Sequence, residues 1–162
     1  MTKAFYSFHF SKDVVRVGQV RNMGAVEGDQ IVDDNSWEKV KNSGEAAIQK
    51  WINRQMALCH VVIVLVGEET ASRPWVDYEI RRAWDSGKPV FGIRIHGLKN
   101  FLGLASRPGP NPFDAINLEG GGKLSTFVPL HSPAGTTSQD IYANISANIR
   151  GWIRAAPRLR IN

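Results

Sequence analysis

One acidic side chain and one indole lie a helical turn apart in the segment best suited to chemistry. Glu79 follows Trp75 at a spacing of i, i+4, so the two side chains are neighbours if the segment is helical. A fixed carboxylate can stabilise a sugar that carries positive charge and can accept hydrogen bonds from ribose hydroxyls. An indole can shield such a site and stack on a ring. The pair therefore predicts a site that stabilises a ribosyl cation.

The same spacing also occurs on helices that carry no chemistry. Glu79 can pair with Arg82 at i, i+3 on a solvated helix face, and Trp75 can serve only as a packing anchor. Spacing alone leaves both interpretations open.

Several other chemistries lack their motifs. The chain has no Gly-x-Gly-x-x-Gly loop, no Walker-type loop and no Gly-x-Ser-x-Gly elbow. The four histidines are scattered and lack the spacing of metal ligands. They are His9, His60, His96 and His131. We therefore expect neither a metal nor a bound cofactor.

The elements around Glu79 form one strand–helix–strand unit. An unbroken apolar run, Val61–Val66, is typical of a strand covered on both faces. The turn Gly67–Ser72 follows, and then a helix from near Pro74 to near Gly87. A second apolar strand, Val90–Ile95, closes the unit. Open α/β sheets bind ligands at the loop after such a strand, so this loop is the expected rim of the site.

The N-terminal region adds a strand and a helix. The aromatic-rich segment Ala4–Phe10 predicts the first strand. Ser11 is a good N-cap, and the helix that follows is expected to end near Asn22. A weak signal for a further strand lies around Ala25 or Ile31.

The remaining elements are two helices and a long segment between them. A helix is predicted over Gly44–Leu58 from its apolar stripe. The segment 97–137 is rich in proline and glycine, so no regular helix can run through it. We expect a short strand there at about Ser125–Leu130. Thr137, with an acidic residue three positions later, predicts the cap of the last helix.

Alternation of strands and helices predicts an α/β fold. We expect a flavodoxin-like parallel sheet of about five strands, with helices on both faces in a three-layer α/β/α arrangement. Right-handed crossovers then place the first strand beside Val61–Val66. We find no domain boundary and expect one domain over 1–162. The rim between these two strands would carry Phe8, His9 and Ser11, opposite Thr70.

Charge and cysteine usage bound the partners and the compartment. The net charge is +5, and the basic residues near the C-terminus fall mostly at helical spacing, which indicates a solvated face rather than a nucleic-acid stripe. They are Arg150, Arg154, Arg158 and Arg160. Cys59 is the only cysteine, so no internal disulfide can form, and we expect a cytoplasmic protein. No apolar run is long enough to span a bilayer, so we expect no membrane partner.

Two segments resemble a known family. Phe5–His9, followed by Asp13, resembles the opening strand motif of TIR and TIR-like domains. Glu68–Ile80 is similar to the segment that carries the catalytic glutamate in NAD-cleaving TIR domains. The similarity extends to the bacterial TIR-like family that includes the NAD-processing component of Thoeris antiphage defence. Further matching segments are Gln19–Asn22, Gly92–Lys99 and Gly109–Phe113.

This resemblance implies a function. It implies a flavodoxin-like fold, Glu79 as the catalytic residue and NAD as the substrate, cleaved at the nicotinamide–ribose bond. The product would be a cyclic ADP-ribose type of signal that reaches an effector. A phage-derived trigger and a homo-oligomer are further expected partners. The candidate substrate-binding residues are Phe8, His9, Ser11, Trp75, Thr70, Arg21 and Asn22.

Two points stay open at this stage. The chain can instead be a catalytically silent TIR-like interaction module that docks through the segment 97–137. If Glu79 is catalytic, it must be ionised to stabilise a cation, although a site that excludes water favours the neutral acid. We therefore expect a nearby donor, with Ser7, Ser11 and Arg82 as the candidates.

Overall fold

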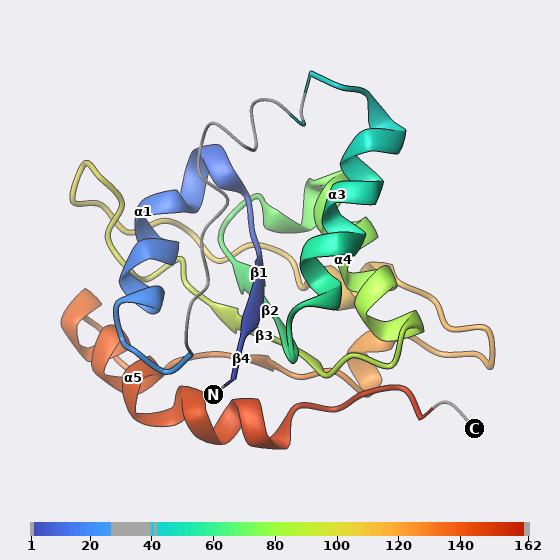
Figure 1. Cartoon of the computed structure of the whole chain (residues 1–162). Helices are drawn as coiled ribbons and strands as arrows, with labels where there is room; N and C mark the ends of the chain where they lie inside the picture. Colours follow the sequence, from blue (N-terminus) through green and yellow to red (C-terminus); the bar gives the residue numbers. More distant parts are fainter. Residues whose placement is uncertain (1, 27–39, 41, 161–162) are drawn as a thin grey trace.

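The centre of the fold is a parallel sheet of four strands. The computed structural model describes residues 2–26, 40 and 42–160 (Figure 1). Within them the strands are β1 (Ala4–Ser7), β2 (Val61–Val66), β3 (Val90–Arg94) and β4 (Leu130–His131). Their spatial order is β1-β2-β3-β4, and every pairing is parallel. The predicted placement of the first strand beside Val61–Val66 is confirmed.

Helices cover both faces of this sheet (Figure 1). On one face, α3 (Glu45–Ala57) and α4 (Pro74–Asp85) enclose one apolar core. On the other face, α1 (Phe10–Arg21) and α5 (Ser138–Ala155) enclose a second core. The predicted three-layer flavodoxin-like α/β arrangement is therefore confirmed, although the described residues form four strands where about five were expected.

Strand β2 explains why two cores are needed. All six of its residues are buried, and their side chains alternate between the two faces. Val62, Val64 and Val66 pack with α3 and α4, whereas Ile63 and Leu65 pack toward α1 and α5. This confirms that an apolar run without alternation marks a strand covered on both sides.

The segment 97–137 contains no α-helix, as its prolines and glycines predict. It forms two 3-10 turns, η2 (Pro112–Ala115) and η3 (Leu124–Thr126), before β4. The expected strand at Ser125–Leu130 is wrong in position. The chain turns through η3 there, and pairing with β3 starts only at Leu130.

The N-terminal boundary also differs from prediction. The first strand ends at Ser7 rather than Phe10, because α1 already begins at Phe10. Its N-cap is His9 rather than Ser11, since His9 Nδ1 accepts a hydrogen bond from the Lys12 backbone N–H at 3.3 Å. Around Ala25 there is no strand, and Ile31 lies outside the described residues. Thr137 caps α5 as predicted, with its Oγ1 accepting from the Asp140 N–H at 3.1 Å.

No helix in the described ranges is both long and apolar enough to cross a membrane. The C-terminal end of the last helix is bonded to the sheet. The carbonyl of Pro157, just after α5, accepts a hydrogen bond from the Val90 N–H at 3.0 Å. The C-terminal segment thereby borders the start of β3.

Replacing Gly92 with alanine tests how tightly side chains pack against β3. A Cβ there would lie 2.9 Å from both Leu130 Cδ1 and Phe113 Cε2. We expect Gly92→Ala to lower the free energy of unfolding by about 1–3 kcal/mol through overpacking. The matched control is Gly18→Ala in α1, where a Cβ meets nothing within 4 Å, and which should gain about 0.5–1 kcal/mol. Urea unfolding measures both, and equal effects would refute this account of the core.

Candidate functional site

Glu79 lies inside the fold, against the end of the first strand. Helix α4 begins with Pro74 at its first position, where the missing N–H costs nothing. Its apolar side chains face the sheet, and Glu79 is buried with them at 8% exposure. Ser7, at the end of β1, has the same parity as Phe5 and so points to this face of the sheet. The carboxyl group and the hydroxyl group thus share one buried region.

Burial dominates the electrostatics of this acid. Loss of water raises the pKa of Glu79 from 4.5 to about 8, and the nearby Ser7 hydroxyl opposes the rise. Neither Ser7 Oγ nor Glu79 Oε2 has a hydrogen bond of normal geometry within the described residues. Ser7 therefore acts as a weak, poorly aligned donor. Of the three expected donors, Ser7 is the one that influences the pKa of Glu79.

The solvent-exposed interpretation of Glu79 does not hold. Arg82 is exposed, and within the described residues it makes no ion pair with Glu79. The ion pair on the outer face of α4 joins Arg81 to Asp77 at 2.7 Å. Trp75 is half-buried, packs on the core of α3 and α4, and meets the Tyr78 ring edge-on at 5.6 Å. Trp75 therefore contributes to the packing of this core, and its predicted contact with a substrate stays a prediction.

His9 follows β1 directly and faces the same end of the sheet. It is 7% exposed, and its Nδ1 accepts the helix-capping hydrogen bond, so the proton of the neutral ring is assigned to Nε2. Burial and then the Arg73 charge lower the pKa of His9, which favours the neutral form of the ring. Ser11 is exposed, with its Oγ 3.3 Å from His9 Nδ1. Phe8 is half-buried beside the Phe10 ring at 6.0 Å.

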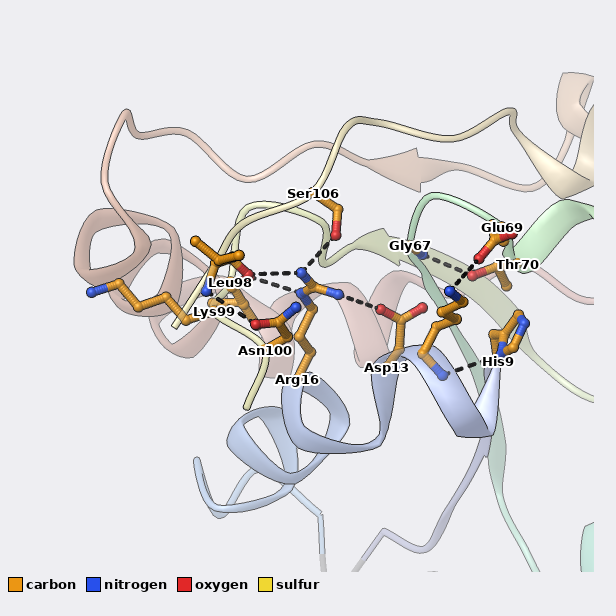
Figure 2. A network of polar contacts seen from close by, with 12 residues as sticks. His9, Asp13, Arg16, Gly67, Glu69, Thr70, Leu98, Lys99, Asn100 and Ser106 are labelled. Atoms are coloured by element: carbon orange, nitrogen blue, oxygen red, sulfur yellow. Dashed lines mark hydrogen bonds and ion pairs between the residues drawn. The ribbon is translucent and has the colours of Figure 1, made fainter. Parts of the chain in front are cut away.

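The loop after β2 forms the opposite side of this rim (Figure 2). Thr70 is 0% exposed, and its Oγ1 accepts a hydrogen bond from the Gly67 N–H at 2.8 Å. Thr70 therefore shapes the loop, and its predicted contact with a substrate remains a prediction. On the outside, Glu69 pairs with Lys12 at 3.5 Å, which joins this loop to the start of α1.

A buried ion pair lies beside the rim and was missed by the sequence interpretation. Arg16 is 2% exposed and donates to Asp13 Oδ1 at 2.7 Å (Figure 2). Burial raises the pKa of Asp13, and the hydrogen bond and charge of Arg16 oppose that rise. The spacing i, i+3 was the available signal, but such pairs are usually exposed on helices. Nothing in the sequence indicated burial, because the groups that cover Arg16 come from residues 98–106.

Two predicted contacts lie elsewhere. Arg21 and Asn22 end α1, whereas His9 begins it, and a helix of 12 residues is roughly 18 Å long. The structure brings Glu79, Ser7, His9 and the Gly67 loop to one end of the sheet, without Arg21 or Asn22. Their role in substrate binding is therefore not supported by this placement.

The chemistry available at this rim is that of a buried acid. Among the described residues, no group of three or more His, Cys, Asp or Glu side chains could hold a metal ion. A carboxyl group with a pKa of about 8 is mostly protonated at pH 7, and an incoming cation would favour its ionised form. The arrangement thus suits stabilisation of positive charge in a site shielded from water.

The raised pKa of Glu79 predicts a pH dependence of stability. Between pH 4.5 and about 8, the unfolded chain loses the Glu79 proton while the folded chain keeps it, so stability falls as pH rises. The slope is about 1.4 kcal/mol per pH unit at most. We expect Glu79→Gln to remove this slope, measured by urea unfolding at pH 5 and pH 8. A slope that is the same in both proteins would refute the buried, neutral acid.

Comparison with known proteins places the chain in a family. A family model described as "Thoeris protein ThsB, TIR-like domain" matches residues 5–100. A Bacillus cereus (strain MSX-D12) protein named "Putative cyclic ADP-D-ribose synthase ThsB1" is 34% identical over 123 residues. The matched region is 72% of this chain and 64% of that protein, so the chain spans less than two thirds of this relative's length. The chain belongs to the TIR-like domain family of Thoeris ThsB proteins.

Proposed function

We propose that this protein cleaves the nicotinamide–ribose bond of NAD and forms a cyclic ADP-ribose type of product. The observation that carries the proposal is the buried Glu79 carboxyl group beside Ser7, at the carboxyl end of β1 and β2. The printed name of the Bacillus cereus relative, a cyclic ADP-D-ribose synthase described as putative, supports the same reaction class.

The chemistry follows from charge. When the bond between nicotinamide and ribose C1′ breaks, nicotinamide leaves with the electron pair and the ribose becomes an oxocarbenium ion. The ionised Glu79 carboxylate stabilises this cation, and the effect is large because the acid is only 8% exposed. A nucleophile of the same ADP-ribose then captures C1′ and loses its proton, which closes the ring. Capture by water would give the linear product instead.

His9 and Trp75 are assigned supporting roles in this proposal. Burial and then the Arg73 charge lower the pKa of His9, which favours the neutral ring, and a neutral ring adds no positive charge beside the ribosyl cation. Trp75 lies one turn before Glu79 on α4 and can present its indole to a ring of the substrate. Phe8 and Ser11 lie at the same end of the sheet and are further candidate contacts.

We place this activity in cytoplasmic antiphage defence, as the Thoeris family suggests. A phage-derived trigger would switch the enzyme on, and the small product would carry the signal to a separate effector. Assembly of several copies is a further part of the proposal.

A second candidate function is an interaction module without catalysis. Its support is an exposed apolar tip in the segment 97–137, where Phe101, Leu102 and Leu104 are 79%, 65% and 58% exposed. Surface residues this apolar often mark contact sites. Nicotinamide release by the purified protein separates the two candidates, because a silent module releases none with or without a trigger.

Replacing the acid tests the enzyme directly. We expect Glu79→Gln to reduce nicotinamide release from NAD at least ~100-fold, because the amide keeps the shape but cannot supply negative charge. The control is Glu119→Gln, an exposed acid distant in sequence that should leave the rate unchanged. Chromatographic assay of nicotinamide, with lysate from phage-infected cells as a trigger, measures both. Equal rates for wild type and Glu79→Gln would sink the assignment.

Ser7 tests the ionisation of that acid. The Ser7 hydroxyl lowers the pKa of Glu79, so Ser7→Ala should raise this pKa further. The active form is ionised, and activity is lost as pH falls through the pKa. We therefore expect the acidic limb of kcat/KM, which reports the free enzyme, to move to higher pH. Ser86→Ala, near the far end of α4, is the matched control and should not move the limb.

A further inference from the structure

We propose that Arg16 is a positioning residue for the candidate site. Together with Asp13, it holds the loop that joins β2 to α4, although neither residue touches the substrate. The effect on catalysis rests on the proposed function, whereas the effect on the loop does not.

Arg16 is committed entirely to internal contacts. It is among the largest fully buried side chains of the described residues. Besides Asp13, it donates to Leu98 O at 2.8 Å, to Leu104 O at 3.0 Å and to Ser106 Oγ at 2.6 Å (Figure 2). Every nitrogen of the guanidinium group therefore has an acceptor. One side chain of α1 thus fixes the loop that follows β3.

Asp13 connects Arg16 to the loop after β2, because it also packs against Gly67. Its Oδ1 accepts from Arg16, whereas its buried Oδ2 has no hydrogen-bond partner within the described residues. That second oxygen lies against the backbone of Gly67. A Cβ added to Gly67 would overlap all three carboxylate atoms of Asp13, closer than any van der Waals contact allows. The Asp13 carboxylate therefore packs directly against Gly67 and limits where the Gly67 backbone can lie.

Gly109 supports the same loop from another direction. A Cβ on Gly109 would overlap the carbonyl oxygens of Gly67 and Glu68. Arg94, at the end of β3, donates from Nη1 to Gly109 O at 2.6 Å and holds it in place. The start of the rim loop is thus packed between Asp13 and Gly109, with no room for a side chain at either glycine.

Arg16 contacts both Asp13 and the segment that leads to Gly109. It binds Asp13 directly, and it binds the segment 98–106, which leads within three residues to Gly109. A buried ion pair contributes little net stability compared with apolar packing, so we assign this pair a role in setting geometry. The geometry set here is the position of Gly67.

The position of Gly67 matters because Glu79 follows it closely. Gly67 bonds to Thr70, Arg73 N–H bonds to Thr70 O, and α4 begins at the next residue. A shift of the loop therefore moves the rim relative to Glu79 and to any bound ribose.

The test combines steady-state kinetics of nicotinamide release from NAD with amide hydrogen exchange. The variants are Arg16→Lys, which keeps the charge but loses the fork of hydrogen bonds, and Gly109→Ala, which leaves Asp13 and Arg16 intact. The control is Gly18→Ala, in the same helix as Arg16 with open space around it. We expect both variants to raise KM about 5-fold or more and to speed exchange of the Gly67 and Arg73 amides about 10-fold.

Partial unfolding cannot reproduce this result, because it lowers apparent kcat, leaves KM unchanged and speeds exchange everywhere. If Arg16→Lys has the same KM as the wild type, or if its Gly67 amide exchanges at the wild-type rate, the proposal is overturned. If Arg16→Lys does not fold, Ser106→Ala, which removes only the Ser106 Oγ acceptor of Arg16, takes its place in the same test. If wild type releases no nicotinamide while the variants still speed exchange at Gly67, the loop restraint stands and the proposed function falls.

Discussion

The parallel pairing of β1 with β2 is the constraint from which the site follows. The two strands are far apart in the chain, yet Ser7 lies opposite Val64 in the sheet. Both strands therefore end at the same edge, and the segments after them, His9 on one side and Gly67 on the other, come together there. Helix α4 returns from this edge across the face that holds Ser7. Glu79 meets Ser7 only because this pairing is in place.

Several buried polar groups lie at that edge of the sheet. Ser7, Asp13 and Glu79 each keep a buried oxygen without a hydrogen bond in the part of the chain that is described. Such groups cost free energy, and native proteins usually satisfy them. The two acids lie on opposite faces of the sheet, one in each of the layers formed by α1 and α4. Burial raises the pKa of both, but only Asp13 has a cation to oppose it.

Much of the architecture could be predicted from apolar patterns. Val61–Val66 and the helix over Gly44–Leu58 were placed within a residue of their observed bounds, because their burial patterns are local and strong. Boundaries set by side-chain capping were harder, since His9 takes a role for which Ser11 is the commoner residue type. The short β4 was misplaced because its position depends on pairing with β3 rather than on its own residues.

The site was only partly predictable for a related reason. The Trp75 and Glu79 spacing predicted a helix that the structure contains, but burial of Glu79 depends on β1, far away in the chain. Arg16 was unrecognisable as a buried residue, because its acceptors belong to residues more than 80 positions later. Two of these acceptors are backbone carbonyl groups, which every residue has, so the residue types give no sign of the contacts.

Because burial raises its pKa, the Glu79 carboxyl group would couple uptake of a cationic ligand to proton release. With a pKa of about 8, most molecules carry the proton at pH 7, so a cation that settles beside this acid must expel it. One proton then appears in the buffer for nearly every cation bound. Below that pKa, apparent affinity for such a cation would fall close to tenfold for each unit by which the pH is lowered, and calorimetric heats would include the ionisation enthalpy of the buffer. The proton would thereby compete with any positively charged ligand of this acid.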